Sequence, residues 1–296
     1  MNNHSKLFSY WRFLSAAILS VLLSSSCFAI DFSQLYSRQD LTRIQQVYGK
    51  NIRAVLFEDI RNYLTLEERK TLSSIKVDIP LYTDNAGLFD FSMDLNTGKM
   101  TISALSVKFL DDLAIAFAWY EYKKLDKQKI IDYVFRLYTN PEQMQPPLPS
   151  LGVPDKAWKV SDYVDDVSQK ILKSAIAFLL LHEFAHWHYQ HSPYDLISNR
   201  MAQKQEKQSD AFALNVMARM HTIPYGMVTW FMVTGLLQSN EARTHPLSSN
   251  RLIAIARRLE QDPAKFIGQE NVDKMTTEDV KRVGREIKSI ASLLDK

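Results

Sequence analysis

Hydrophobic residues recur at helical spacing over most of the chain. Between residues 32 and 70, apolar side chains such as Leu41, Ile44 and Ile52 stand three or more positions apart, which is typical of amphipathic helices. Residues 109–124 show the same spacing and are rich in aromatic side chains. From residue 164 onward the whole pattern is helical. We predict helices there over residues 171–191, 201–220, 225–237 and 246–260.

Two short segments alternate between apolar and polar residues instead. Residues 75–82 predict one strand, and residues 89–102 predict a β-hairpin with a turn at Asn96-Thr97-Gly98. Prolines crowd residues 141–154, which predicts a long surface connection. The expected fold class is therefore α+β and predominantly α, with a small β-hairpin or sheet before the helical part.

The first 29 residues have the pattern of a secretory signal peptide. Lys6 and Arg12 precede an apolar run over residues 13–23, which is shorter than a bilayer span, and a small polar stretch follows. We expect cleavage after Ala29 and export to the periplasm or the medium. Cys27, the only cysteine, leaves a lipid-anchored form open as the less favoured alternative. Membrane attachment is expected only if Cys27 is lipidated.

The remaining residues, 30–296, are predicted to form a single domain. Its first part, residues 30–155, contains the hairpin, and its second part, residues 156–296, is helical. The formal net charge is +3, and Lys6 and Arg12 supply two of these charges. The near-neutral remainder gives no electrostatic reason to expect nucleic-acid binding. The sequence does not indicate an oligomeric state.

Residues 182–186 read H-E-F-A-H at the end of an apolar run, which predicts a buried helix. His182 and His186 lie one turn apart on the same face, so both imidazoles can reach one metal ion. Glu183 is rotated by about 100°, beside the open position of such an ion, where it can take a proton from bound water. The alternative is a core helix with two hydrogen-bonded histidines.

A catalytic zinc site needs a third protein ligand, and Glu206 is a better candidate for it than the nearby His188 and His191. Glu206 and Asp210 share one helical face on a segment that can return antiparallel to the first helix. Glu206 can then bind zinc while Asp210 accepts a hydrogen bond from the far nitrogen of a ligand histidine. His188 and His191 do not fit the spacing of a third histidine ligand, so we expect them at the surface or behind the ligands. The alternative for Glu206 and Asp210 is a solvated acidic pair.

Residues 244–251 read T-H-P-L-S-S-N-R and contain a third candidate element. Pro246 suits the first position of a helix, which puts His245 where the chain turns. The functional interpretation has His245 at the mouth of the site and Arg251 paired with an acidic group near it. The alternative is an ordinary helix start with an exposed arginine.

The three elements in this order resemble the gluzincin zinc metallopeptidases. The spacing of H-E-x-x-H and the later glutamate is similar to that of thermolysin. The T-H-P-x-x-x-x-R stretch looks more like the prenyl-protein and HtpX-type peptidases, and the phage-exclusion peptidase Lit is a possible relative. The resemblance covers residues 171–258 and implies a zincin-like fold, Zn²⁺ ligands His182, His186 and Glu206, and a general base, Glu183. Asp210 and Arg251 would support the ligands, and the hairpin would line the substrate cleft.

This resemblance leads to the expectation of a zinc endopeptidase that acts on proteins or peptides. His245 or Tyr225 could stabilise the oxyanion of the reaction. A bolder hypothesis is that the His245 imidazole occupies the open position of the metal and keeps the enzyme latent. The main alternative function is a non-catalytic zinc-binding partner protein of the cell envelope, against which the intact Glu183 argues. A purely structural helical protein without metal is the second alternative.

Overall fold

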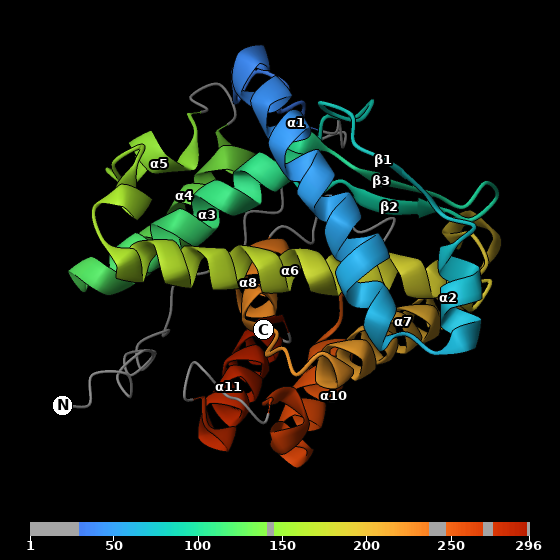
Figure 1. Ribbon diagram of the computed structural model, residues 1–296. Helices are drawn as coiled ribbons and strands as arrows, with labels where there is room; N and C mark the ends of the chain where they lie inside the picture. The colour runs from blue at the N-terminus through green and yellow to red at the C-terminus, as the bar shows by residue number, and fades with distance from the viewer. Residues whose placement is uncertain (1–29, 141–144, 237–246, 269–274, 295–296) are drawn as a thin grey trace.

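A computed structural model of the chain describes residues 30–140, 145–236, 247–268 and 275–294 (Figure 1). The predicted signal peptide, Cys27 and His245 lie outside these residues. The α-helices are α1 (Arg38–Ala54), α2 (Leu66–Leu72), α3 (Ala104–Lys123), α4 (Gln128–Thr139), α5 (Pro147–Ser150), α6 (Asp162–His188), α7 (Asn199–Arg219), α8 (Tyr225–Leu236), α10 (Ser249–Gln261) and α11 (Thr277–Leu294). The strands are β1 (Lys76–Asp78), β2 (Phe91–Asp94) and β3 (Lys99–Ile102). The predominantly helical α+β fold class is confirmed.

Helix α6 is the central element of the molecule. It contacts α3, α7, α8 and strand β2, and in Figure 1 the other elements lie on either side of it. All residues from Ser174 to His186 are buried, because helices or strands cover every face of this segment. Its apolar stretch is therefore a core helix, as the sequence predicts. No helix of the described residues is both long enough and apolar enough to cross a lipid bilayer.

The sheet has the strand order β1-β3-β2. Strands β2 and β3 form the predicted antiparallel hairpin, with Met93 opposite Met100, whereas β1 pairs with β3 in parallel. Gly98 closes the hairpin with a φ of +68°, a conformation that glycine adopts without steric cost. The predicted strand over 75–82 is shorter in the structure, where only β1 is extended.

An indole ring fixes the hairpin against α6. A Cβ atom at Gly98 would lie 2.9 Å from Cζ2 of Trp187, so the turn and the ring are in close contact. The Trp187 Nε1–H also donates to Ser74 Oγ at 3.0 Å, just before β1. Trp187 follows His186 directly, and it therefore ties the sheet to the part of α6 that carries the histidines.

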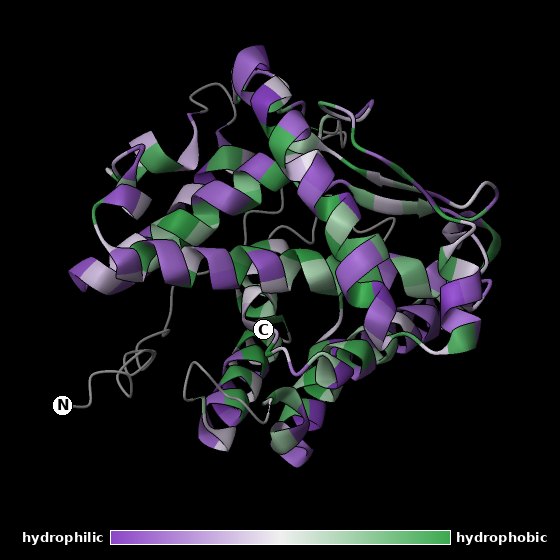
Figure 2. Cartoon of the chain, viewed as in Figure 1, coloured by the Kyte–Doolittle hydropathy of each residue, from purple (hydrophilic) through white to green (hydrophobic). Residues whose placement is uncertain are grey.

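Within residues 32–70, which the sequence predicts to be helical, the structure has α1, a π-helical turn (Val55–Asp59), a 3₁₀ turn (Ile60–Tyr63) and most of α2, whereas residues 32–37 form turns before α1. Helix α1 is amphipathic and lies on the outside, so hydrophobic and hydrophilic residues alternate along it in Figure 2. Its buried residues, among them Leu41, Ile44 and Ile52, face the core. These are apolar positions that the helical spacing in the sequence predicts.

Two parts of the sequence prediction need correction. Residues 145–154 are not simply a surface connection, because they contain α5 and bury Leu148, Leu151 and Val153. The carbonyl of Leu151 accepts a hydrogen bond from the Tyr120 hydroxyl at 2.9 Å. In addition, α4 lies between residues 125 and 140, where no element is predicted from the sequence. Its N-cap residue, Lys127, makes no capping hydrogen bond through its side chain, so the usual start signal is missing.

Helix α8 approaches α6 closely through Gly226. A Cβ atom there would lie 2.2 Å from the Ile171 carbonyl oxygen and 2.5 Å from the Ala175 amide nitrogen. We therefore expect Gly226→Ala to push the two helices apart and lower the free energy of unfolding by about 3 kcal/mol, the upper part of the range for overpacking. Denaturant unfolding of the purified variant measures this loss.

Gly152→Ala is the matched control for this substitution. Gly152 has a φ of +64°, but a Cβ atom at this position would have no other atom within 4 Å, so the variant tests backbone strain without a clash. We expect a cost of only about 1–2 kcal/mol there. If both variants lost the same stability, close packing of α8 on α6 would not explain the need for Gly226.

Candidate metal centre

The H-E-x-x-H stretch lies in the buried C-terminal half of α6, and Glu206 and Asp210 lie on α7. His182 contacts Asp210, and His186, further along α6, contacts Glu206, which is earlier on α7. The two helices are therefore antiparallel, as predicted. Ser198 starts α7 by accepting a hydrogen bond from the Met201 amide, which sets where the returning helix begins.

His182, His186 and Glu206 form a buried group that could hold a metal ion. The two Nε2 atoms are 3.2 Å apart; His182 Nε2 lies 3.4 Å from Glu206 Oε2, and His186 Nε2 lies 3.2 Å from the other oxygen, Oε1. Zinc bonds of about 2.0–2.1 Å in tetrahedral geometry separate neighbouring ligand atoms by about 3.3–3.4 Å. The donor types and their spacing therefore fit Zn²⁺. Within the described part of the chain, no second group of this kind is present.

Asp210 and Arg251 support this group from behind. Asp210 Oδ1 lies 3.0 Å from His182 Nδ1, which fixes the imidazole with Nε2 directed at Glu206. Arg251 of α10 donates to Asp210 Oδ1 through Nη2 at 2.8 Å and pairs with Glu206 Oε2 through Nη1 at 2.6 Å. The acidic partners expected for Arg251 are thus the two carboxylates of α7.

The charges of the buried group favour a cation. Burial opposes a charged imidazole at His182, yet the carboxylates of Glu206 and Asp210 outweigh it and raise the pKa of His182 to about 10. Burial would raise the pKa of Asp210, but the Arg251 guanidinium lowers it. One guanidinium therefore faces two carboxylates, and the group has a place for a further positive charge.

Glu183 is buried on α6 but does not belong to the group of three possible ligands. Its carboxylate is close enough to Tyr194 to raise the pKa of that hydroxyl. Glu183 follows His182 directly on α6, so its side chain is rotated by about 100° from that of His182. A buried carboxylate next to a possible ligand is a candidate proton acceptor.

Tyr194 is a site residue that sequence reasoning missed. It lies in the 3₁₀ turn Tyr194–Leu196 between α6 and α7, and its hydroxyl donates to Glu206 Oε1. Burial and the Glu206 charge raise its pKa well above 10, so the hydroxyl keeps its proton. The candidate suggested from sequence, Tyr225, instead donates to the Met275 sulfur at 3.5 Å. The place of Tyr194 in the short link between the two helices that carry the possible ligands is the sequence signal that could have identified it.

The other two histidines of α6 and its following turn have different surroundings. His188 Nδ1 lies 3.1 Å from Thr71 Oγ1, and its ring stacks on Phe184, away from the group of ligands. His191 is buried, and its Nδ1 lies 3.0 Å from His186 Nδ1. Of the two, His191 is therefore the one that lies behind a possible ligand.

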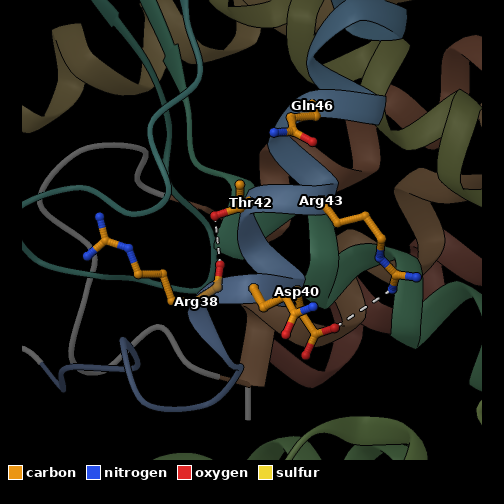
Figure 3. A pocket seen from close by; sticks show the side chains of 6 residues that line it. Arg38, Asp40, Thr42, Arg43 and Gln46 are labelled. Atoms are coloured by element: carbon orange, nitrogen blue, oxygen red, sulfur yellow. Dashed lines mark hydrogen bonds and ion pairs between the residues drawn. The ribbon is translucent and has the colours of Figure 1, made fainter.

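A shallow concavity of about 600 Å³ lies elsewhere, along the first turns of α1 (Figure 3). Its lining includes the exposed ion pair of Arg43 and Asp40, at 3.8 Å, and an intrahelical hydrogen bond from Thr42 to the Arg38 carbonyl. The residues that line it include none of the possible metal ligands. Among the described residues, the one group that could hold a metal ion therefore lies away from this concavity, on α6 and α7.

Comparison with known proteins gives one result. A family model described as Peptidase U49 matches residues 121–270, half of the chain, and this range includes every described residue of the candidate metal centre. No curated protein and no solved structure matches the chain.

Proposed function

The chain belongs to the Peptidase U49 family, and on that premise we propose that it is a zinc-dependent endopeptidase of gluzincin type that cleaves protein substrates. Membership of this family supports a peptidase activity. The observation that carries the proposal is the buried group of His182, His186 and Glu206, whose spacing suits one tetrahedral ion.

In this proposal the two imidazoles and the Glu206 carboxylate hold the ion. When bound, a zinc ion supplies Lewis-acid polarisation of the scissile carbonyl and makes water more acidic. Glu183 takes a proton from the attacking water on a carboxylate oxygen and later passes it to the leaving amine nitrogen. The Tyr194 hydroxyl keeps its proton and donates a hydrogen bond to Glu206 Oε1; turned from Glu206 toward the substrate, it is the candidate donor to the developing oxyanion.

Removal of the metal tests the proposal. We expect the purified chain to contain about one zinc ion, and treatment with a chelator to abolish digestion of a general protein substrate such as casein. Adding Zn²⁺ back should restore the activity. Metal content and digestion are measured on the same sample, with a zinc-independent protease treated in parallel as the control for the chelator.

The outcomes separate the alternatives. Digestion that persists in metal-free protein would contradict a metallopeptidase. A chain that binds zinc but cleaves no protein substrate would favour the non-catalytic partner protein. We further propose, from the pattern of residues 1–29 alone, that the enzyme acts after export in the periplasm or the medium.

A further inference from the structure

The turn after α6 bends the chain back so that His191 meets His186. The amide of Gln190 donates to the Trp187 carbonyl at 3.1 Å, and the amide of His191 donates to the His186 carbonyl at 3.0 Å. Gln190 has a φ of +52°, so these two bonds form a Schellman motif with a left-handed residue. The motif places residue 191 beside residue 186, five positions earlier, which a continuing helix would not do.

The ring of His191 fits between α6 and α7. Its centroid lies 4.8 Å from that of His186 at an interplanar angle of 81°, and only 8% of the residue is exposed. Its Nδ1 atom lies 3.0 Å from His186 Nδ1, and its Nε2 atom lies 3.3 Å from Gln208 Oε1. One ring nitrogen of His191 therefore faces a ring nitrogen of His186, and the other faces an oxygen that can only accept a hydrogen bond.

The position of the protons follows from this arrangement. His186 directs Nε2 at Glu206 and at the other imidazole, so binding of a metal there requires a lone pair on Nε2. A neutral His186 then carries its proton on Nδ1 and donates it to Nδ1 of His191. His191 in turn carries its own proton on Nε2, where the Gln208 carbonyl oxygen accepts it.

We propose that His191 is a positioning residue that holds His186 in the tautomer able to bind metal, with Gln208 fixing the tautomer of His191. It is the neutral counterpart of Asp210, which has the same task at His182 through a carboxylate. The proposal rests on the proposed metal site. It concerns the hydrogen bond at His186 Nδ1 and not the identity of the substrate.

Zinc affinity of His191 variants, measured by competition with a chromogenic chelator, tests the proposal. We expect His191→Leu to weaken binding by about 10–100-fold, the range for loss of such a partner. His191→Asn places an amide oxygen near the position of Nδ1 and should keep most of the affinity. The absorption spectrum of the Co²⁺-substituted protein should change in the leucine variant and remain close to wild type in the asparagine variant.

His188→Leu is the matched control, because His188 is in the same turn and its hydrogen bond goes to Thr71. A purely structural role would lower the melting temperature in both leucine variants and leave zinc affinity unchanged. Equal zinc affinities for His191→Leu and His188→Leu would overturn the proposal, even if the wild type bound zinc and cleaved protein. A wild type without zinc affinity would instead overturn the proposed function.

Gln208→Leu decides the question if His191→Leu does not fold. Gln208 is exposed on α7, so its replacement leaves the core unchanged. We expect a weaker zinc affinity in Gln208→Leu and a near-normal one in Gln208→Glu, which keeps an acceptor for His191 Nε2. The same affinity in both variants would remove Gln208 from the proposed chain of hydrogen bonds.

Discussion

Glu183→Gln is expected to reduce protein hydrolysis by about 10²–10⁴-fold, the usual contribution of a general base, while the zinc content stays unchanged. The glutamine has nearly the same shape as the glutamate but cannot accept the proton of the attacking water. Since Glu183 is buried and is not among the three possible ligands, its replacement should leave the ion in place. The measurements are kcat/KM on a fluorogenic peptide and metal analysis of the same preparation.

Glu206→Gln is the control that separates proton acceptance by Glu183 on α6 from metal binding by Glu206 on α7. It replaces a possible ligand, so we expect loss of zinc together with loss of activity. Undiminished hydrolysis in Glu183→Gln would remove Glu183 from the mechanism. Loss of zinc in that variant would instead show that Glu183 acts on the ion and not on the water.

Arg251→Met is expected to lower the free energy of unfolding of the metal-free protein by about 3–5 kcal/mol. That is the range for removing one partner of a buried ion pair. The guanidinium lies against Glu206 and Asp210, and all three side chains are buried, so its removal leaves two carboxylates to repel each other. For a domain of this size the melting temperature should fall by about 6–20 °C. Calorimetry or circular dichroism on chelator-treated protein measures this.

Arg258→Met on the same helix is the matched control. Arg258 pairs with Asp262, but both side chains are 32% exposed, so water already screens their charges. We expect a loss of at most about 1 kcal/mol there. Similar losses for the two variants would show that Arg251 is not a buried counter-ion of α7. Added Zn²⁺ should raise the stability of Arg251→Met by more than it raises that of the wild type. Its effect on Arg258→Met should be close to its effect on the wild type.

The core of the candidate site could be predicted because its spacing is local. His182 and His186 are separated by one helical turn, and so are Glu206 and Asp210, so each pair shares a face whatever the rest of the fold does. The antiparallel return then follows from the short link between the helices. Arg251 was expected near an acidic group, but which carboxylates it meets depends on how α10 packs, 41 residues after Asp210 in the sequence.

The residues that sequence reasoning missed or left open lie in irregular backbone. Tyr194 is in a short 3₁₀ turn, and the position of His191 depends on the left-handed conformation of Gln190. Neither follows from a hydrophobic period, because the period ends with the helix. Helix α4 was missed for a related reason, since its start lacks a side-chain cap, although Ile130, Val134 and Leu137 are buried.

The contact of Trp187 with Gly98 has a consequence for the shape of the molecule. One indole, adjacent in sequence to His186, sets how close the tip of the hairpin comes to the histidine-bearing helix. The hairpin is thereby held against α6 at its turn, in addition to the contacts that β2 makes with this helix. A bulkier residue at position 98 would press on the indole, so a change in the hairpin turn would reach the residue that follows His186.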